Sequence, residues 1–245
     1  MQTSAAHYDT HLGPIYSWML GDIDAAFARS AAEIESLALP VANHPTATAV
    51  DLGAGLGLHT LALARRGFRV TAIDSCRVLL DELSSRCAGL PVTPLKADLL
   101  NFRSLISAQP TVVLCMGDTL THLPGRAAVE SLLESISAAL PSGGVFAATF
   151  RDYATRTLEG DGRFIQVRAD AQRILTCFLE YTEHIVTVHD LINEWRDDQW
   201  HQTVSSYPKL RLAPEWMVSR LTDLGFKVRR DATPGGMTRI VAAKD

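Results

Sequence analysis

The chain has 245 residues, of which 47% are hydrophobic and 20% are charged, as is typical of a folded globular protein and unlike a disordered one. The formal net charge of -4 lacks the positive field of most nucleic-acid-binding proteins, so we expect no nucleic-acid partner. The four cysteines form no CxxC pair, and the first 22 residues have neither a basic start nor a long apolar run. We therefore expect a cytoplasmic protein without a signal peptide or membrane span.

The first 150 residues predict an α/β unit. Residues 22–38 place apolar side chains at helical spacing, and from residue 48 strands alternate with helices, which indicates a parallel sheet covered on both faces. The predicted strands are 48–52, 68–74, 91–95, 111–115 and 144–150, and the predicted helices between them are 58–66, 76–87 and 124–140.

After Phe150 the pattern changes to β-branched and aromatic runs, which predict a small antiparallel sheet over residues 163–206. A helix from Pro214 to about Leu224 and a hairpin around the turn TPGG then close the main sheet. We expect four parts: an N-terminal helical cap (1–45), a cofactor-binding core (46–150), a substrate lid (151–210) and a C-terminal helix with a closing hairpin (211–245).

A glycine-rich turn lies at the first strand-to-helix junction, where Gly53, Gly55 and Gly57 occur in the run AVDLGAGLG. Glycine lets the backbone turn sharply and approach a ligand, and the helix that follows presents unpaired N–H groups to a negative group. A tight turn that only connects packed elements explains the same glycines.

Two acidic residues follow the next two strands. Asp74 can accept hydrogen bonds from both hydroxyls of a ribose, and Asp98 can accept one from an adenine amino group. Either residue alone can equally be a helix cap. A dinucleotide-binding loop requires glycine at position 58, which is leucine, and no phosphate-binding G-x-x-x-x-G-K-[ST] loop is present.

The run VDLGAGLG, together with Asp74, Asp98 and the C-terminal hairpin, resembles the class I methyltransferases that depend on S-adenosylmethionine (SAM). The resemblance implies a Rossmann-like, doubly wound seven-stranded sheet whose last strand is antiparallel, with SAM as the cofactor. It also implies that the glycines line the methionine end of SAM, that Asp74 holds the ribose and that Asp98 and Leu99 border the adenine. The expected cofactor contacts are Asp51, Gly53, Ala54, Gly55, Gly57, Asp74, Ser75, Asp98, Leu99, Met116, Tyr16 and Trp18.

The segment CMGDTLTHL at residues 115–123 resembles the small-molecule subgroup typified by glycine N-methyltransferase, in which it reads like LGNSFAHL. Asp118 replaces the asparagine. Its carboxylate can hold an ammonium group, accept a proton from the nucleophile or cap the next turn. His122 is a candidate base, or a histidine whose hydrogen bonds are satisfied within the loop. No Cys/His cluster is present, so we expect no metal.

Arginines and aromatic residues are the remaining candidates for substrate contacts. Arginine can clamp a carboxylate, and aromatic rings can exclude water or face a cation, although most arginines are solvated and aromatic residues also anchor helices. The expected substrate contacts are Tyr8, Asp118, Thr119, Arg151, Tyr153, Arg173, Tyr181, Tyr207 and Arg211.

The leading functional hypothesis is N- or O-methylation of a small amino- or carboxyl-bearing metabolite. One alternative is an enzyme that cyclises or eliminates the aminocarboxypropyl arm of SAM and releases methylthioadenosine. The other is a noncatalytic SAM-binding module. For the oligomeric state, both a monomer and a homodimer remain open.

Overall fold

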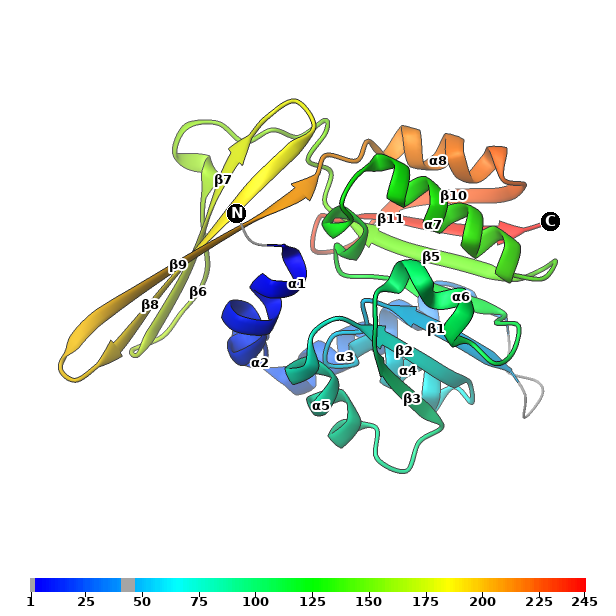
Figure 1. The fold of residues 1–245 in the computed structure, drawn as a ribbon, viewed down its shortest axis with the longest axis horizontal. Coiled ribbons are helices and arrows are strands. Elements are labelled where there is room, and N and C mark those ends of the chain that lie inside the picture. The colour runs from blue at the N-terminus through cyan, green and yellow to red at the C-terminus, as the bar shows by residue number, and fades with distance from the viewer. Residues whose placement is uncertain (1–2, 41–46) are drawn as a thin grey trace.

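Seven strands form one mixed sheet in the computed structural model, which describes residues 3–40 and 47–245 (Figure 1). These strands are β1 (Thr48–Leu52), β2 (Arg69–Asp74), β3 (Val92–Lys96), β4 (Val112–Cys115), β5 (Val145–Phe150), β10 (Phe226–Ala232) and β11 (Thr238–Lys244). Their order is β10-β11-β5-β4-β1-β2-β3. Strand β11 pairs antiparallel with both β5 and β10, which confirms the expected seven-stranded sheet with its antiparallel last strand.

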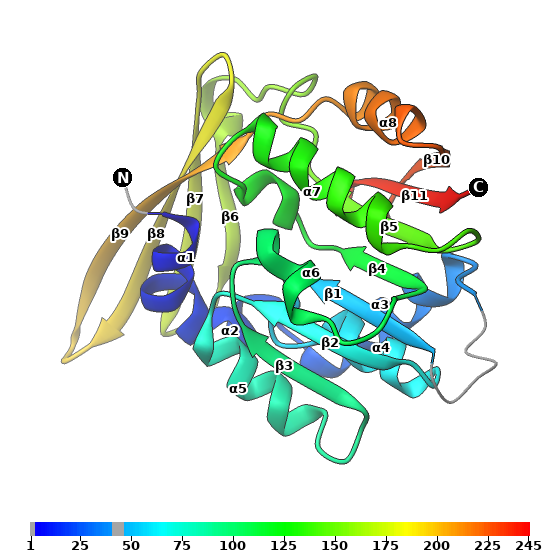
Figure 2. The same cartoon turned by 45° about the vertical axis from the view of Figure 1, so that its right-hand side comes forward.

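Burial explains why the central strands read as continuous apolar runs. Every residue of β4 and β5 is buried, as expected for strands covered on both faces. Helices α3 (Ile23–Ser36), α4 (Leu58–Arg65) and α5 (Arg77–Arg86) pack on one face. Helices α6 (Phe102–Leu105), α7 (Arg126–Ala139) and α8 (Pro214–Asp223) pack on the other, where Figure 2 shows α7 and α8.

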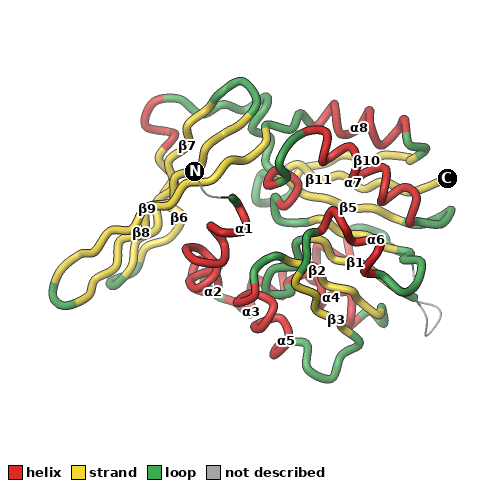
Figure 3. Tube along the Cα trace, in the orientation of Figure 1, coloured by secondary structure: helices red, strands yellow, loops and turns green. Residues whose placement is uncertain are grey.

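Four strands form a separate antiparallel sheet, drawn in yellow apart from the main sheet in Figure 3. They are β6 (Phe164–Ala169), β7 (Arg173–Tyr181), β8 (Ile185–Arg196) and β9 (Gln199–Leu210), preceded by the 3-10 turn η5 (Gly160–Arg163). The predicted antiparallel sheet is therefore confirmed. It extends to Leu210 because β9 stays paired with β8 along its whole length, from Gln199 opposite Arg196 to Leu210 opposite Ile185.

The N-terminal segment folds into short helical turns that the sequence did not predict: α1 (Ser4–His7), η1 (Tyr8–Leu12), η2 (Gly13–Ile15) and α2 (Tyr16–Leu20). These turns lie between the two sheets (Figure 1). The buried ring of His7 joins them to the antiparallel sheet, because it contacts Asp190 Oδ2 at 2.8 Å and Ser205 Oγ at 2.7 Å. The expected boundary at residue 45 lies outside the described residues.

Helix α7 begins later than predicted. The carbonyl of Gly125 accepts hydrogen bonds from the backbone N–H groups of Ala128 and Val129, so the helix starts at Arg126 and Pro124 remains in the preceding loop. The short elements η3 (Leu99–Asn101), α6 and η4 (Thr119–His122) also follow strand ends. They are too short to give a periodic signal, and the sequence did not predict them.

Candidate functional site

A cavity of about 770 Å³ opens beside the carboxyl ends of β1, β2 and β4. Strand order reverses between β1 and β4, and in open α/β sheets ligands bind outside the strand ends at such a point. The inserted sheet also contributes to the wall through Ile185, Pro208, Lys209 and Leu210, and the N-terminal turns contribute Tyr8 and Tyr16.

The glycine turn forms one wall of this cavity. Gly53 has a φ of 74° and Gly55 a φ of 54°, both in the left-handed region that favours glycine. A Cβ atom at Gly53 would overlap the side chain of Thr119, whereas one at Gly55 would meet no atom within 4 Å. Gly53 is therefore required for packing against η4, and Gly55 leaves an open space beside the backbone.

The carboxylate of Asp74 fixes this turn from the end of β2. Its Oδ2 accepts a hydrogen bond from Gly55 N at 2.8 Å, and its Oδ1 accepts one from Cys76 N at 2.8 Å. Burial raises the pKa of Asp74 above its usual value, although the backbone hydrogen bonds oppose the shift. Each carboxylate oxygen has a further lone pair with which it can accept a hydrogen bond from a hydroxyl group.

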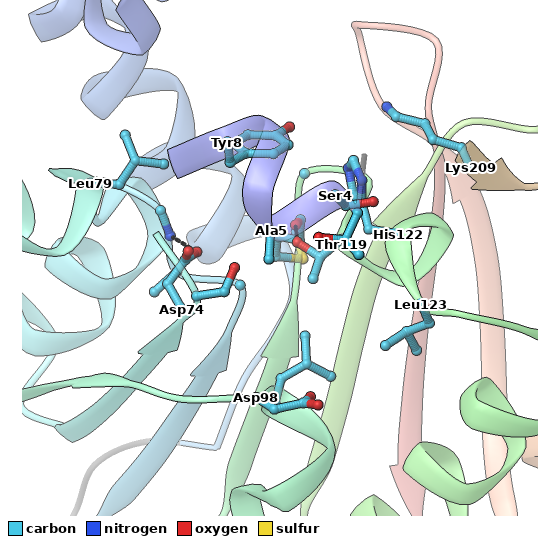
Figure 4. A pocket seen from close by; sticks show the side chains of 18 of the residues that line it. Ser4, Ala5, Tyr8, Asp74, Leu79, Asp98, Thr119, His122, Leu123 and Lys209 are labelled. Atoms are coloured by element: carbon cyan, nitrogen blue, oxygen red, sulfur yellow. Dashed lines mark hydrogen bonds between the residues drawn. The ribbon is translucent and has the colours of Figure 1, made fainter. Parts of the chain in front are cut away.

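Asp98 combines the two roles that the sequence left open. Its Oδ1 caps η3 by accepting a hydrogen bond from Leu100 N at 2.9 Å, and the residue also lines the cavity. Apolar neighbours Leu79, Leu99 and Leu100 complete this end, and Figure 4 shows Asp74, Leu79 and Asp98 around it. Acceptors for a ribose and apolar walls for a base are the chemistry that the adenosyl group of SAM requires, so these residues fit that cofactor.

Rings from three segments meet at the other end of the cavity. His122 stacks on Tyr207 with ring centres 5.5 Å apart, and Tyr8 meets the edge of His122 at 5.4 Å. The Nδ1 atom of His122 is buried and has no hydrogen-bond partner among the described residues. Burial and the nearby charge of Lys209 lower the pKa of His122 to about 3, so the ring is neutral near pH 7.

Lys209 and Asp118 form a buried ion pair beside these rings, with Nζ 2.6 Å from Oδ2. Asp118 Oδ1 accepts a hydrogen bond from Arg151 N at 2.9 Å, and the Tyr153 hydroxyl lies 3.5 Å from Oδ2. Although burial opposes it, the positive charge of Lys209 holds the pKa of Asp118 below its usual value. The carboxylate is thus occupied by protein groups and does not line the cavity, so the structure does not support its predicted contact with an ammonium group.

More than half of the predicted site residues do line the cavity: Tyr8, Tyr16, Gly53, Ala54, Gly55, Asp74, Ser75, Asp98, Leu99, Met116, Thr119 and His122. The structure thereby brings the glycine turn, both acidic strand ends and the 116–122 loop together around one space.

Three predicted cofactor residues lie away from the cavity lining because protein contacts hold them. Asp51 is buried and accepts a hydrogen bond from Thr60 Oγ1 at 2.6 Å. A Cβ at Gly57 would meet Leu83 of α5, so this glycine serves helix packing. Trp18 donates a hydrogen bond to Asp170 and lies under two arginine side chains.

Several predicted substrate residues are likewise engaged elsewhere. Arg173 pairs with Glu194 at 2.6 Å, and Arg211 donates hydrogen bonds to backbone carbonyls that include that of Tyr153. Arg151 has an exposed side chain. Tyr153, Tyr181 and Tyr207 are not among the lining residues, although the ring of Tyr207 stacks on His122.

Sequence reasoning missed Lys209, which is buried and lines the cavity. A lysine between Pro208 and Leu210 in an alternating strand, on the same face as Tyr207, is a signal that could have identified it. Ser4, Leu100 and Ile185 were missed because nothing local distinguishes them. Within residues 3–40 and 47–245, no cluster of His, Cys, Asp or Glu suited to a metal was found. No helix in that part of the chain has the length and apolarity to span a bilayer.

Comparisons with known proteins give one family match and several similar folds. Residues 49–144 match the methyltransferase domain family. The fold is similar to that of the CcbJ methyltransferase from Streptomyces caelestis (TM-score 0.79, 18% identity, 97% of this chain and 98% of that one). It is also similar to CalS10, an amino pentose methyltransferase from Micromonospora echinaspora (TM-score 0.74, 16% identity, 96% and 97%).

A third similar structure is a SAM-dependent methyltransferase from Clostridium acetobutylicum (TM-score 0.75, 13% identity, 97% of this chain and 98% of that one). At these identities the likeness establishes the fold. No curated protein sequence matches the chain.

Proposed function

We propose that this SAM-dependent methyltransferase transfers a methyl group to the amino group of a small amino- or carboxyl-bearing metabolite. The match of residues 49–144 to the methyltransferase domain family supports this enzyme class, and the SAM-bound structure of the similarly folded CalS10 supports SAM as the cofactor. The observation that carries the proposal is one continuous cavity with two chemically different ends. One end offers Asp74 and Asp98, and the other offers His122 and Lys209.

The cofactor end would hold SAM through the glycine turn and the two carboxylates. SAM supplies a methyl group on a positively charged sulfur, which makes that carbon open to in-line displacement. The protein has to align two reactants and exclude water, and alignment alone can account for about 7 to 11 kcal/mol of a barrier. Asp74 is suited to this task because its hydrogen bonds to Gly55 N and Cys76 N fix its orientation before a ligand binds.

The substrate end favours a neutral amine. Lys209 is the one lysine or arginine among the described residues that line the cavity. Asp118 balances its charge, and Asp74 and Asp98, the carboxylates of the described lining, lie at the cofactor end. An amine at the substrate end therefore meets no free carboxylate that would stabilise its protonated form, and the neutral amine keeps its lone pair for the methyl group. Leu123, Ile185 and Leu210 exclude water from this end.

The inserted sheet and the N-terminal turns both contribute residues to the cavity wall, and their positions indicate their roles. The inserted sheet supplies Ile185, Pro208 and Leu210 to the substrate end, so we propose that it acts as the substrate lid. The N-terminal turns supply Tyr8 and Tyr16, and we propose that they cap the cofactor. The similarly folded CalS10 is an amino pentose methyltransferase, which supports an acceptor that carries an amino group.

The alternative reaction, in which the aminocarboxypropyl arm of SAM reacts, depended on a free carboxylate at Asp118. That carboxylate is bound by Lys209 and the backbone of Arg151. The observation that favoured the alternative is therefore absent, and methyl transfer remains the better-supported reaction.

Mass spectrometry of SAM incubated with the enzyme and a panel of small amines and carboxylic acids tests this proposal. We expect S-adenosylhomocysteine together with one methylated amine, and no product without an acceptor. Methylthioadenosine formed from SAM alone would instead establish the alternative reaction. Tight SAM binding with no product from any acceptor would indicate a noncatalytic module.

A further inference from the structure

We propose that His122 and Lys209 form a subsite that recognises a hydroxyl group next to the amine that is methylated. This inference rests on the proposed function, because it describes the substrate of the same cavity. It assigns the acceptor to the amino alcohols, a class that includes amino sugars, rather than to amino acids or simple amines.

The first step of the argument concerns unused hydrogen-bonding groups. The ammonium group of Lys209 has three N–H donors. Among the described residues, its acceptors are Asp118 Oδ2 at 2.6 Å and the neighbouring hydroxyl of Tyr153. A third donor therefore remains. His122 Nδ1 is buried without a partner among the same residues. Buried polar groups in native proteins nearly always have partners, so a ligand is expected to supply these.

The second step concerns where these groups lie. Both residues line the cavity, and both contact the ring of Tyr207: the His122 ring centre is 5.5 Å from it and Lys209 Nζ is 5.7 Å from it. Figure 4 shows both side chains on the side of the cavity opposite Asp74. The two unused groups therefore belong to the substrate end rather than the cofactor end.

The third step matches donors with acceptors. Lys209 can only donate a hydrogen bond, whereas a neutral imidazole has one nitrogen that accepts and one that donates. A hydroxyl satisfies both residues at once, because its oxygen accepts from Lys209 and its hydrogen is donated to His122. An ammonium group has no lone pair for Lys209.

A carboxylate fits less well than a hydroxyl. The charge of Lys209 is already balanced by Asp118 at 2.6 Å, so a substrate carboxylate would place a second negative charge beside a pair that is neutral overall. Its desolvation would then lack a compensating cation. The electrostatics of the pair therefore favour a neutral group that both donates and accepts.

Binding of three matched probes to the enzyme loaded with S-adenosylhomocysteine tests the subsite. The probes are trans-2-aminocyclohexanol, cyclohexylamine, which lacks the hydroxyl, and trans-2-aminocyclohexanecarboxylate. By isothermal titration calorimetry, we expect the amino alcohol to bind about 10-fold more tightly than either of the others, as befits hydrogen bonds to one charged and one neutral partner.

Substitutions then test whether His122 and Lys209 cause the preference for the probe that carries a hydroxyl group. His122→Phe keeps a ring against Tyr207 and should reduce the hydroxyl preference severalfold. The double variant Asp118→Asn/Lys209→Met removes the ion pair without leaving a buried charge, and should do the same. Exposed His184→Phe and Lys227→Met serve as matched controls, since their side chains are 83% and 80% exposed. Binding of S-adenosylhomocysteine to each variant reports that it is folded.

Equal binding of the three probes, no binding of the amino alcohol or a preference for the carboxylate would overturn the subsite. A hydroxyl preference that survives both substitutions would also overturn it. Failure of the proposed function is a separate result, because the probes bind to an enzyme that holds no methyl donor. Hydroxyl-dependent binding without methylation of any amine would leave the subsite intact and refute amine methylation.

Discussion

Lys209 Nζ lies 2.6 Å from Asp118 Oδ2, and this ion pair joins β9 of the antiparallel sheet to the loop after β4 of the main sheet. The side chains are only 9% and 6% exposed. Removing two charges from water is costly, and the cost is recovered only when partners are well placed. Here Arg151 N and the ring of Tyr207 complete the surroundings of the pair. The pair therefore holds the antiparallel sheet against the loop after β4 at the substrate end of the cavity.

Lys209→Met should destabilise the protein by about 3 to 5 kcal/mol, because it leaves the buried carboxylate of Asp118 without its cation. Lys227→Met, at an exposed ion pair with Asp245, should change the free energy of unfolding by less than about 0.5 kcal/mol. Urea denaturation of both variants measures the difference. Similar effects of the two substitutions would contradict the structural importance of the buried pair.

Asp118→Asn should show a stability loss that depends on pH. The folded-state pKa of Asp118 lies below its usual value of 3.8. The stability that the carboxylate contributes is therefore fully present above about pH 4 and is lost as pH falls through the folded-state pKa. The wild-type advantage over the variant should therefore be constant from pH 7 to pH 5 and shrink at more acidic pH. An advantage that grows on acidification would be inconsistent with the pair.

His122→Phe should make the protein less sensitive to acid. The pKa of His122 is 6.5 when unfolded and about 3 when folded, so between these values the unfolded chain binds a proton that the folded chain does not. Wild-type stability should therefore fall more steeply than that of the variant, by up to about 1.4 kcal/mol per pH unit. Denaturant titrations at pH 7, 6 and 5 provide the comparison. Parallel pH profiles would argue that His122 is not buried as described.

Gly53→Ala should destabilise the protein more than Gly89→Ala does. Both glycines have positive φ values, 74° and 80°, so both substitutions incur a backbone cost of about 1 to 2 kcal/mol. Only the Cβ at position 53 overlaps a neighbour, Thr119, whereas position 89 is open. Overpacking against Thr119 should therefore lower the free energy of unfolding of Gly53→Ala by about 1 to 3 kcal/mol more. Thermal unfolding followed by circular dichroism distinguishes the two variants. Equal melting temperatures would refute the close contact between position 53 and Thr119.

Much of the fold could be predicted because its signals are local. The apolar strands β4 and β5 and the hairpin of β10 and β11 read directly from residue patterns. The helical turns at residues 4–20 could not be predicted in the same way. They are short, and contacts such as His7 with Asp190 hold them against the antiparallel sheet. Such elements depend on tertiary packing rather than on periodicity.

The candidate site was predictable at its cofactor end and less so at its substrate end. The glycine turn, Asp74 and Asp98 are fixed by strand ends that converge on one edge of the sheet. The role of Asp118 depended on Lys209, a residue 91 positions later in the chain. Local sequence shows a carboxylate in a loop, but it does not show that a distant cation already occupies it.

Isothermal titration calorimetry of SAM binding to Asp74→Ala tests the central claim, that the glycine turn and the carboxylate of Asp74 grip the cofactor. Asp81→Ala is the control, because that side chain is 67% exposed on α5. Loss of hydrogen bonds to a charged acceptor should weaken SAM binding on the order of 10- to 100-fold in Asp74→Ala, with no change in the control. Undiminished SAM affinity in a folded Asp74→Ala protein would contradict the account.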